Sequence, residues 1–239
     1  DYCRTHELKG VDMGRCMARK HHAKVQPKRL SKPRKSSGPR STIPKSMSDP
    51  SNWTVEQTQL GKPGKEGTVL MAQHQQSNTL GAAKTFRKTK AQSTMRKEFD
   101  LMALAADAGV AATPYAFDYP NRMYIMERMD KTLPELIKAQ HGVLTKAQQL
   151  RIIELLERIG EAGIYHGDPN PLNFMTDMNG QLQLIDFGFA KKINKKLIAW
   201  GGSNPNMHSL HFLLFNPMQG LIKKGTLTTQ PDILLAALK

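Results

Sequence analysis

The alternation of apolar and polar positions changes near residue 52, and regular structure is expected beyond that point. Short apolar stretches separated by glycine-containing turns predict strands at residues 53–61, 67–75, 79–86, 115–120, 122–129 and 181–188. Stretches with apolar residues at helical spacing predict helices at residues 93–109, 145–163, 204–215 and 231–239. The order is a small β-rich segment with one helix, followed by a largely helical segment, which indicates an α+β fold.

The two longer helices have the clearest start and stop signals. The first is expected to begin at the Ser93-Thr94 pair and to end at Gly109. The second ends at Gly163 and has an apolar stripe formed by Leu150, Ile153, Leu156 and Ile159.

Residues 1–50 lack this patterning. They hold 13 Lys and Arg against 4 Asp and Glu, a net charge of +9 out of +15 for the whole chain. Residues 24–46 are rich in Lys, Arg, Pro and Ser, so they cannot bury enough surface to offset the entropy lost on ordering. We therefore expect a flexible basic arm at residues 1–50, which either binds a polyanion such as nucleic acid or is a solvated tail.

The arm also contains thiol and imidazole groups of the kind that bind zinc, at Cys3, His6, Cys16, His21 and His22. Structural zinc needs four ligands in tetrahedral geometry. The sequence leaves two interpretations open, a partial Cys/His zinc motif and unpaired thiols in a tail. The chain has only 2 cysteines, so a disulfide framework is not expected and a reducing compartment is the default.

Polar residues gather in the stretch YHGDPNPLNFMTDMNGQLQLIDFGFA, residues 165–190. A buried core needs none of its acidic and amide side chains. Asn173 and Asp186 offer oxygen atoms, the ligands that magnesium prefers, and magnesium usually keeps some waters and substrate phosphates as well. Asp168 then remains to orient an attacking hydroxyl and accept its proton. The pattern indicates a phosphoryl-transfer site.

The segments HGDPNPLN and DFG resemble the catalytic loop and the metal motif of the protein kinase superfamily, at that family's separation. The resemblance implies a two-lobed fold that holds ATP in the cleft between its lobes. It also implies that Asp168 is the catalytic base, that Asn173 and Asp186 bind the metal, and that His166 supports the loop.

The stretch LGKPGKEGTVL resembles the glycine-rich hairpin that covers the ATP phosphates in this family. Only glycine lets backbone amides approach phosphates so closely. The resemblance implies nucleotide-binding roles for Gly61, Gly64, Gly67 and Val69, although Gly61 stands one residue too early and the first turn therefore carries an insertion.

Two further matches lie between the hairpin and the catalytic loop. Lys84 in GAAK matches the strand lysine that steadies the α and β phosphates, and Glu98 matches the helix glutamate that pairs with it. YIMERM resembles the strand that leads into the interlobe hinge. This implies Met126 as the gatekeeper, with backbone contacts to adenine from Glu127 and Met129.

The chain also departs from the family. Asn170 stands where the catalytic loop usually has a lysine, which removes one cation from the transition state. Lys191 and Lys192 are candidates to replace it. No Ala-Pro-Glu follows Asp186, no activation loop of the usual length is evident, and 53 residues remain after this aspartate.

These losses are similar to those of reduced, atypical kinases. That group includes the small kinase of the tRNA-modification complex, compact bacterial effector kinases and the kinase-like proteins of large DNA viruses. We therefore expect a two-lobed kinase-like fold with an N-lobe at residues 51–129 and a truncated C-lobe at residues 130–239, preceded by the basic arm.

The expected activity is ATP- and magnesium-dependent phosphoryl transfer to Ser or Thr hydroxyls of a protein. The arm itself offers acceptors at Ser31, Ser36, Ser37, Ser41 and Thr42. Two alternatives stay open. The first is a small-molecule phosphotransferase of the aminoglycoside or choline type, which shares the His-Gly-Asp pattern. The second is a catalytically weak structural or virion-associated component that keeps the kinase fold.

The expected partners are a protein substrate, an activating protein, and nucleic acid or another polyanion bound by residues 1–50. No apolar run approaches the roughly 20 residues of a membrane span, and no secretory signal is visible. We expect a cytoplasmic or nuclear protein of a host cell, or one packaged in a virion, and not a secreted protein.

Overall fold

The computed structural model describes residues 43–64 and 66–238, all within the compact unit Pro33–Lys239. Most of the basic arm, including its serine and threonine acceptors, lies outside the described residues. The same holds for the zinc ligands proposed at Cys3, His6, Cys16, His21 and His22.

The end of the stretch that was expected to be an extended arm is folded. Lys45–Ser48 form the short helix α2. The Trp53 indole donates a 2.9 Å hydrogen bond to the carbonyl of Met47, and the Asn52 side chain donates one of 2.8 Å to the carbonyl of Ser46. These bonds attach the turn to the first strand, so the expectation of an extended chain is wrong for these residues.

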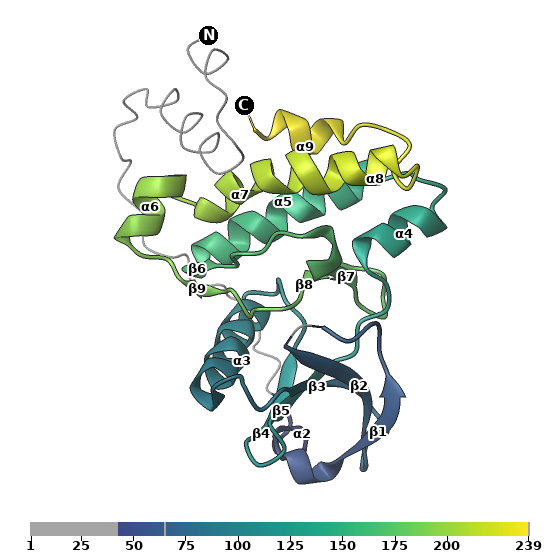
Figure 1. Ribbon diagram of the computed structural model, residues 1–239, viewed down its shortest axis with the longest axis vertical. Helices are drawn as coiled ribbons and strands as arrows, with labels where there is room; N and C mark the ends of the chain where they lie inside the picture. The colour runs from purple at the N-terminus through teal and green to yellow at the C-terminus, as the bar shows by residue number, and fades with distance from the viewer. Residues whose placement is uncertain (1–42, 65, 239) are drawn as a thin grey trace. The chain divides into compact units, whose positions relative to one another are not determined.

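Five antiparallel strands form one sheet in the order β1-β2-β3-β5-β4 (Figure 1). They are β1 (Trp53–Gln59), β2 (Gly67–His74), β3 (Leu80–Phe86), β4 (Pro114–Asp118) and β5 (Met123–Glu127). Each was expected from the hydrophobic pattern. Alternate residues of a strand face opposite sides of a sheet. One side carries a cluster around Trp53, which stacks on Tyr115 with ring centroids 5.2 Å apart.

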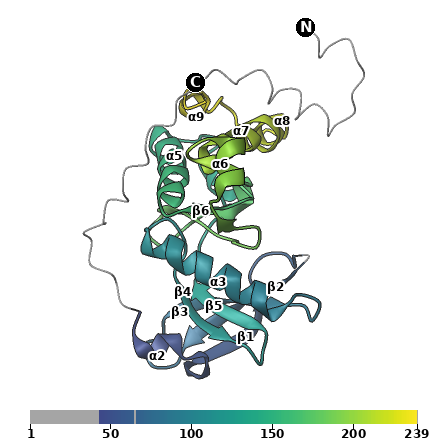
Figure 2. The same cartoon turned by 90° about the vertical axis from the view of Figure 1, so that its left-hand side faces the viewer.

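The other side of the sheet faces helix α3 (Gln92–Asp107), which lies between the strands and the later helices (Figure 2). The predicted stop is confirmed, because Gly109 follows with a left-handed φ of +71°. The predicted start is wrong. Ala91 is the N-cap and its side chain caps nothing. A tertiary contact instead holds the preceding loop, since the Arg122 guanidinium donates to the carbonyls of Arg87 and Lys90.

The second half of the chain is mainly helical. Its helices are α4 (Leu133–Ala139), α5 (Lys146–Glu161), α6 (Lys195–Gly201), α7 (Pro205–Leu213), α8 (Gln219–Lys223) and α9 (Asp232–Ala236). Its short strands pair as β6 (Ile164–Tyr165) with β9 (Lys191–Lys192), and β7 (Phe174–Thr176) with β8 (Leu182–Leu184). None of the helices in the described ranges is both long and apolar enough to cross a bilayer.

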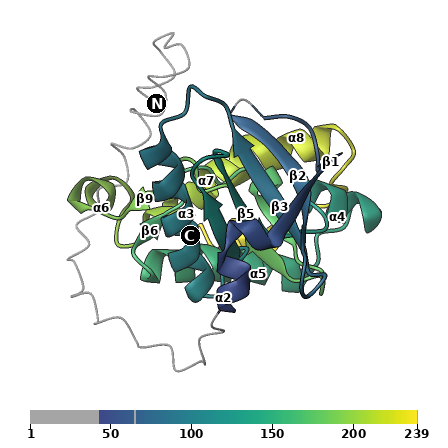
Figure 3. The same cartoon turned by 90° about the horizontal axis from the view of Figure 1, so that it is seen from below.

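Helix α5 organises this half. Thr145 and Gln148 form a reciprocal capping box at its start. Its buried face consists of Gln149, Ile152, Leu155, Leu156 and Ile159. The expected stripe was partly wrong, because Leu150 is 49% exposed. Figure 3 shows α5, α7 and α8 behind the sheet when the molecule is seen from below.

The chain after α7 differs from the short helix expected at 204–215. Helix α7 continues through a π-helical turn, Leu214–Met218, into α8. Pro217 lies in that turn and lacks an N–H, so a regular α-helical bond cannot form there. The helix predicted at the C-terminal end is confirmed as α9, and the buried Gln149 accepts hydrogen bonds from the amides of Ile233 and Leu234.

Candidate active site

A cluster of ionic side chains joins the sheet, helix α3 and the segment after β8. Lys84 on β3 places its Nζ 2.6 Å from Oε1 of Glu98 on α3 and 2.8 Å from Oδ1 of Asp186. Glu98 is 2% exposed. A buried carboxylate needs such partners, because an unpaired buried charge is strongly destabilising. The structure therefore brings together three of the residues that the kinase resemblance identified.

The sheet register explains how this cluster is assembled. Val69, Lys84 and Tyr124 are direct cross-strand neighbours on β2, β3 and β5. Their side chains therefore share one face of the sheet. The Tyr124 hydroxyl donates a 2.8 Å hydrogen bond to Oε1 of Glu98. Its pKa is raised well above the usual value by burial and by the neighbouring Glu98 carboxylate, so it stays a hydrogen-bond donor.

The protonation states follow from these contacts. Burial alone would lower the pKa of Lys84, but the carboxylates of Glu98 and Asp186 outweigh it and the pKa lies above its usual value. Burial would raise the pKa of Asp186, whereas the Lys84 ammonium outweighs this and holds it below its usual value. Both groups are therefore charged at neutral pH.

Asp186 has an unusual backbone, with a φ of +59°. Aspartate is one of the few residues that adopt this left-handed conformation at tolerable cost. The adjoining Phe187 is 1% exposed and belongs to the main core cluster, which fixes the backbone on the C-terminal side. Strain of this kind is typical of functional sites.

The loop that the kinase resemblance identifies as the catalytic loop, residues 166–173, lies beside this aspartate. The amide of Ile185 donates a 3.0 Å hydrogen bond to the carbonyl of Asn173. The Nδ2 of Asn173 donates to the carbonyl oxygen of Asp168 at 3.1 Å and to its Oδ2 at 2.9 Å. In the described residues no donor is paired with Oδ1 of Asn173, so the amide oxygen is available for another ligand.

His166 connects the catalytic loop to the segment of Asp186. Its Nε2 lies 2.9 Å from the carbonyl of Ile185, and its Nδ1 accepts a hydrogen bond of 3.4 Å from the amide of Asp168. These partners fix the neutral tautomer with the proton on Nε2. Burial lowers the pKa of His166 despite the nearby carboxylates of Asp168 and Asp186, so the ring is a structural connector and not a charged group.

Gly167 shows why the chain has His-Gly-Asp here. Its φ is +84°, and a Cβ atom would lie 2.6 Å from the carbonyl oxygen of Phe189. The segment after Asp186 therefore packs directly on the catalytic loop, and no larger residue fits between them.

The residue that anchors this loop, Asn206, was not identified from the sequence. It lies in the first turn of α7 and is 1% exposed. Its Oδ1 accepts a 2.9 Å hydrogen bond from the amide of His166, and its Nδ2 donates one of 2.7 Å to the carbonyl of Ile164. The Asn-Pro-Asn sequence signals a helix start, but it does not reveal a partner 40 residues away.

We expect Asn206→Ala to lower the free energy of unfolding by about 2–4 kcal/mol, because it leaves one buried N–H and one buried C=O without partners. Urea denaturation measures this change. Asn216→Ala is the matched control, since Asn216 is exposed on the helical turn that follows. Equal stability of the two variants would show that Asn206 does not anchor the loop.

The glycine-rich hairpin connects β1 to β2. A Cβ at Gly67 would lie 1.7 Å from the Thr85 carbonyl oxygen, so only glycine fits at the start of β2. Gly61 has a φ of +76°, and the amide of Gly64 donates a 2.9 Å hydrogen bond to the carbonyl of Gly67. Val69 packs against the main core next to Lys84.

The expected hinge follows β5. Met126 is 7% exposed and belongs to the main core cluster. The amide of Glu127 donates a 2.7 Å hydrogen bond to the carbonyl of Thr113, so that N–H is already used. Among the described residues, no backbone carbonyl is paired with the amide of Met129, which leaves this group available to a ligand.

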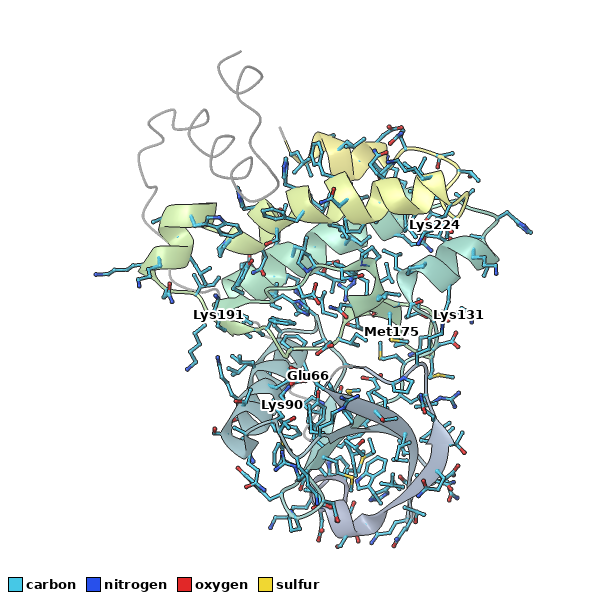
Figure 4. All side chains as sticks on the ribbon, viewed as in Figure 1. Glu66, Lys90, Lys131, Met175, Lys191 and Lys224 are labelled. Carbon is cyan, nitrogen blue, oxygen red and sulfur yellow. The ribbon has the colours of Figure 1, made fainter. Side chains whose placement is uncertain are left out.

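Asn170 and the two candidate replacements for the missing lysine, Lys191 and Lys192, have different surroundings. The Asn170 side chain accepts a 3.0 Å hydrogen bond from the amide of Leu172, so it caps a short 3₁₀ turn. Lys191 and Lys192 line a separate cavity against α3 with Arg96 and other residues. Figure 4 shows Lys191 apart from Glu66 and Lys90, which lie near the ionic cluster. In the described part of the chain no ion pair joins either lysine to Asp168.

Comparison with known proteins agrees with this geometry. The family model described as protein kinase domain matches residues 54–203. The chain is 27% identical over 159 residues to the probable serine/threonine-protein kinase ndrC of Dictyostelium discoideum, covering 62% of this chain and 12% of that protein. It is 30% identical over 139 residues to cyclin-dependent kinase 7 of Carassius auratus, covering 54% of this chain and 40% of that protein. The chain thus spans less than half the length of these curated relatives.

Proposed function

Because the chain belongs to the protein kinase family, we propose that it transfers the γ-phosphoryl group of ATP to a serine or threonine hydroxyl of a protein. The observation that carries the proposal is the ion cluster of Lys84, Glu98 and Asp186, bonded through Ile185 to the loop that holds Asp168. Phosphoryl transfer depends mostly on positioning and charge neutralisation. This cluster provides a fixed cation and two carboxylates in one place.

In this proposal the residues from the N-terminal half hold the nucleotide. Lys84 contacts the α and β phosphates and is kept in place by Glu98. The backbone of Gly64 and Gly67 covers the phosphates, with Gly61 in the first turn of the hairpin. Val69 and Met126 border the adenine, while the backbone of Glu127 and the free amide of Met129 contact its edge. The division into an N-lobe at 51–129 and a reduced C-lobe at 130–239 belongs to the same proposal.

Magnesium fits the oxygen atoms that the site leaves available. Asn173 would bind it through Oδ1, because its Nδ2 is used by Asp168. Asp186 would bind it through Oδ2, because its Oδ1 is paired with Lys84. Both are hard oxygen ligands, and magnesium usually takes its remaining ligands from phosphate and water. When bound, the ion neutralises phosphate charge that develops during transfer.

Asp168 is the proposed base. Its carboxylate lies at the start of the loop and is oriented by the Asn173 amide, at 2.9 Å from its Oδ2. From that position it would align the acceptor hydroxyl and receive its proton.

The test is to incubate the full chain with γ-labelled ATP, with a basic acceptor protein and, separately, with choline and an aminoglycoside. Label on serine or threonine of protein, lost when EDTA removes magnesium and regained when magnesium is restored, is the expected result. Phosphopeptide mapping would show whether the arm's own Ser31, Ser36, Ser37, Ser41 or Thr42 is an acceptor. Label on the small cationic alcohols alone would replace the proposal with a small-molecule phosphotransferase. ATP binding without transfer would indicate a non-catalytic protein.

A further inference from the structure

A second lysine shares the buried glutamate of the site. Lys90, in the loop between β3 and α3, places its Nζ 2.7 Å from Oε2 of Glu98, while Lys84 occupies Oε1. The Lys90 side chain is 8% exposed and its Nζ lies 4.6 Å from the centroid of the Phe86 ring. Its loop is held by the Arg122 guanidinium, which donates to the Lys90 carbonyl. Lys90 is therefore a fixed cation and not a solvated surface lysine.

Lys90 also binds a carboxylate from the glycine-rich hairpin. Its Nζ forms an ion pair with Oε2 of Glu66, and Figure 4 shows the two labelled residues next to each other. A Cβ at Gly188 would lie 3.3 Å from this same oxygen and 3.3 Å from Oδ1 of Asp186. The Glu66 carboxylate thus reaches the metal-motif segment, where the proposed function places the nucleotide phosphates. It offers the same kind of anionic oxygen that a phosphate would.

The charges in this region do not balance. The carboxylates of Glu66, Glu98 and Asp186 face the two ammonium groups of Lys84 and Lys90. A nucleotide triphosphate would add more negative charge beside them, and like charges at close range repel. Glu66 must therefore leave before phosphate can occupy the place next to Lys90.

The exposures show which partner can leave. The Glu66 side chain is 46% exposed, so its carboxylate can turn into solvent. Breaking an ion pair with such an exposed partner costs little. Lys90 has no comparable freedom, because it packs on Phe86 and stays bonded to the buried Glu98. When Glu66 moves away, the Lys90 ammonium has one N–H without an acceptor, directed at the space that the Glu66 carboxylate occupied.

We propose that Lys90 is a phosphate-binding residue of the nucleotide site, which exchanges the Glu66 carboxylate for a phosphate oxygen when ATP binds. Lys90 would then supply a positive charge that is missing because Asn170 stands where the catalytic loop usually has a lysine. The inference rests on the proposed function, because it assigns Lys90 to the nucleotide of that same site.

Two single substitutions distinguish this role from a structural one. Lys90→Gln and Glu66→Gln break the same ion pair. If this pair only holds the hairpin in place, its loss should change ATP affinity in the same direction in both variants. If Lys90 binds phosphate, Lys90→Gln weakens ATP binding by roughly 10-fold or more, the usual effect of losing one hydrogen bond to a charged group. Glu66→Gln strengthens ATP binding by about several-fold, because it removes the competing charge.

The measurement is calorimetric titration of the full chain with ATP and with adenosine, in the presence of magnesium. Affinity for adenosine, which carries no phosphate, should change little in either variant. Lys90→Arg should retain most of the preference for ATP over adenosine. Lys88→Gln is the matched control, because it removes the same charge from an exposed position in the same loop.

The proposal is wrong if Lys90→Gln leaves the ratio of ATP to adenosine affinity unchanged, or if the two variants shift it in the same direction. Glu66→Gln alters an exposed side chain, so it should fold and test the proposal even if Lys90→Gln does not fold. Unchanged or weaker ATP binding by Glu66→Gln would overturn the proposal. Binding is measured separately from transfer. A chain that binds ATP without phosphorylating protein would contradict the proposed function and still test Lys90, and a chain that binds no ATP would contradict both.

Discussion

Replacing Asp168 with asparagine is expected to lower the rate of phosphoryl transfer by roughly 10²- to 10⁴-fold, the usual contribution of a positioned general base. The Asp168 carboxylate is oriented by a 2.9 Å hydrogen bond from Asn173 and by the backbone contact of its amide with His166. An asparagine keeps the size of the side chain and one oxygen acceptor. It cannot accept the proton of the attacking hydroxyl.

Initial rates with labelled ATP and a saturating protein acceptor measure this effect, and titration with ATP shows whether binding is retained. Asp100→Asn is the control, because it removes the same charge from an exposed position on α3. A rate for Asp168→Asn within about threefold of wild type would be too small a loss for a general base, and the base would have to be sought elsewhere.

The second large effect is expected at Asp186. Asp186→Asn should reduce the transfer rate by roughly 10²- to 10³-fold, as the loss of one group that stabilises transition-state charge does in other enzymes. Asparagine is the informative replacement because the backbone φ of +59° is one that asparagine adopts readily, whereas alanine would be strained there. The substitution therefore removes the charge with little change of the backbone.

Magnesium dependence provides the specific measurement for Asp186. Wild type should bind ATP more tightly as magnesium is added, and Asp186→Asn should lose most of that gain. Asn173→Ala should lose part of it, because the proposal gives both residues to the same ion. If ATP affinity in Asp186→Asn still rises with magnesium as it does in wild type, the metal is held by other residues.

The sequence was informative where local chemistry decides the outcome. The five strands of the sheet and helices α3, α5, α7 and α9 follow from hydrophobic periodicity and from glycine stops such as Gly109. The resemblance to the kinase motifs identified Lys84, Glu98 and Asp186, and the structure places the Lys84 ammonium 2.6 Å from Glu98 and 2.8 Å from Asp186. These three residues could be identified because the hydrophobic pattern also predicted the strand and the helix on which Lys84 and Glu98 lie.

Local patterns failed where contacts between distant segments dominate. Helix α3 starts at Gln92 after the N-cap Ala91 and has no Ser/Thr cap, and Arg122 holds the preceding loop through a contact with a distant segment. The stripe expected on α5 included Leu150, which is 49% exposed, because packing against other segments decides which residues of the helix are buried. Helices α4 and α6 have too few periodic positions to be recognised alone.

The sequence by itself determined which groups are present for the proposed phosphoryl transfer, namely carboxylates, an amide, a strand lysine and a glycine-rich turn. Only the tertiary structure decided their partners. Tyr124 and Lys90 reach Glu98, Glu66 reaches Lys90, and Asn206 holds the loop of Asp168 from 40 residues away. The reason is physical. A side chain's type is encoded in one position, whereas its burial, charge balance and hydrogen bonds depend on segments that meet only when the chain is folded.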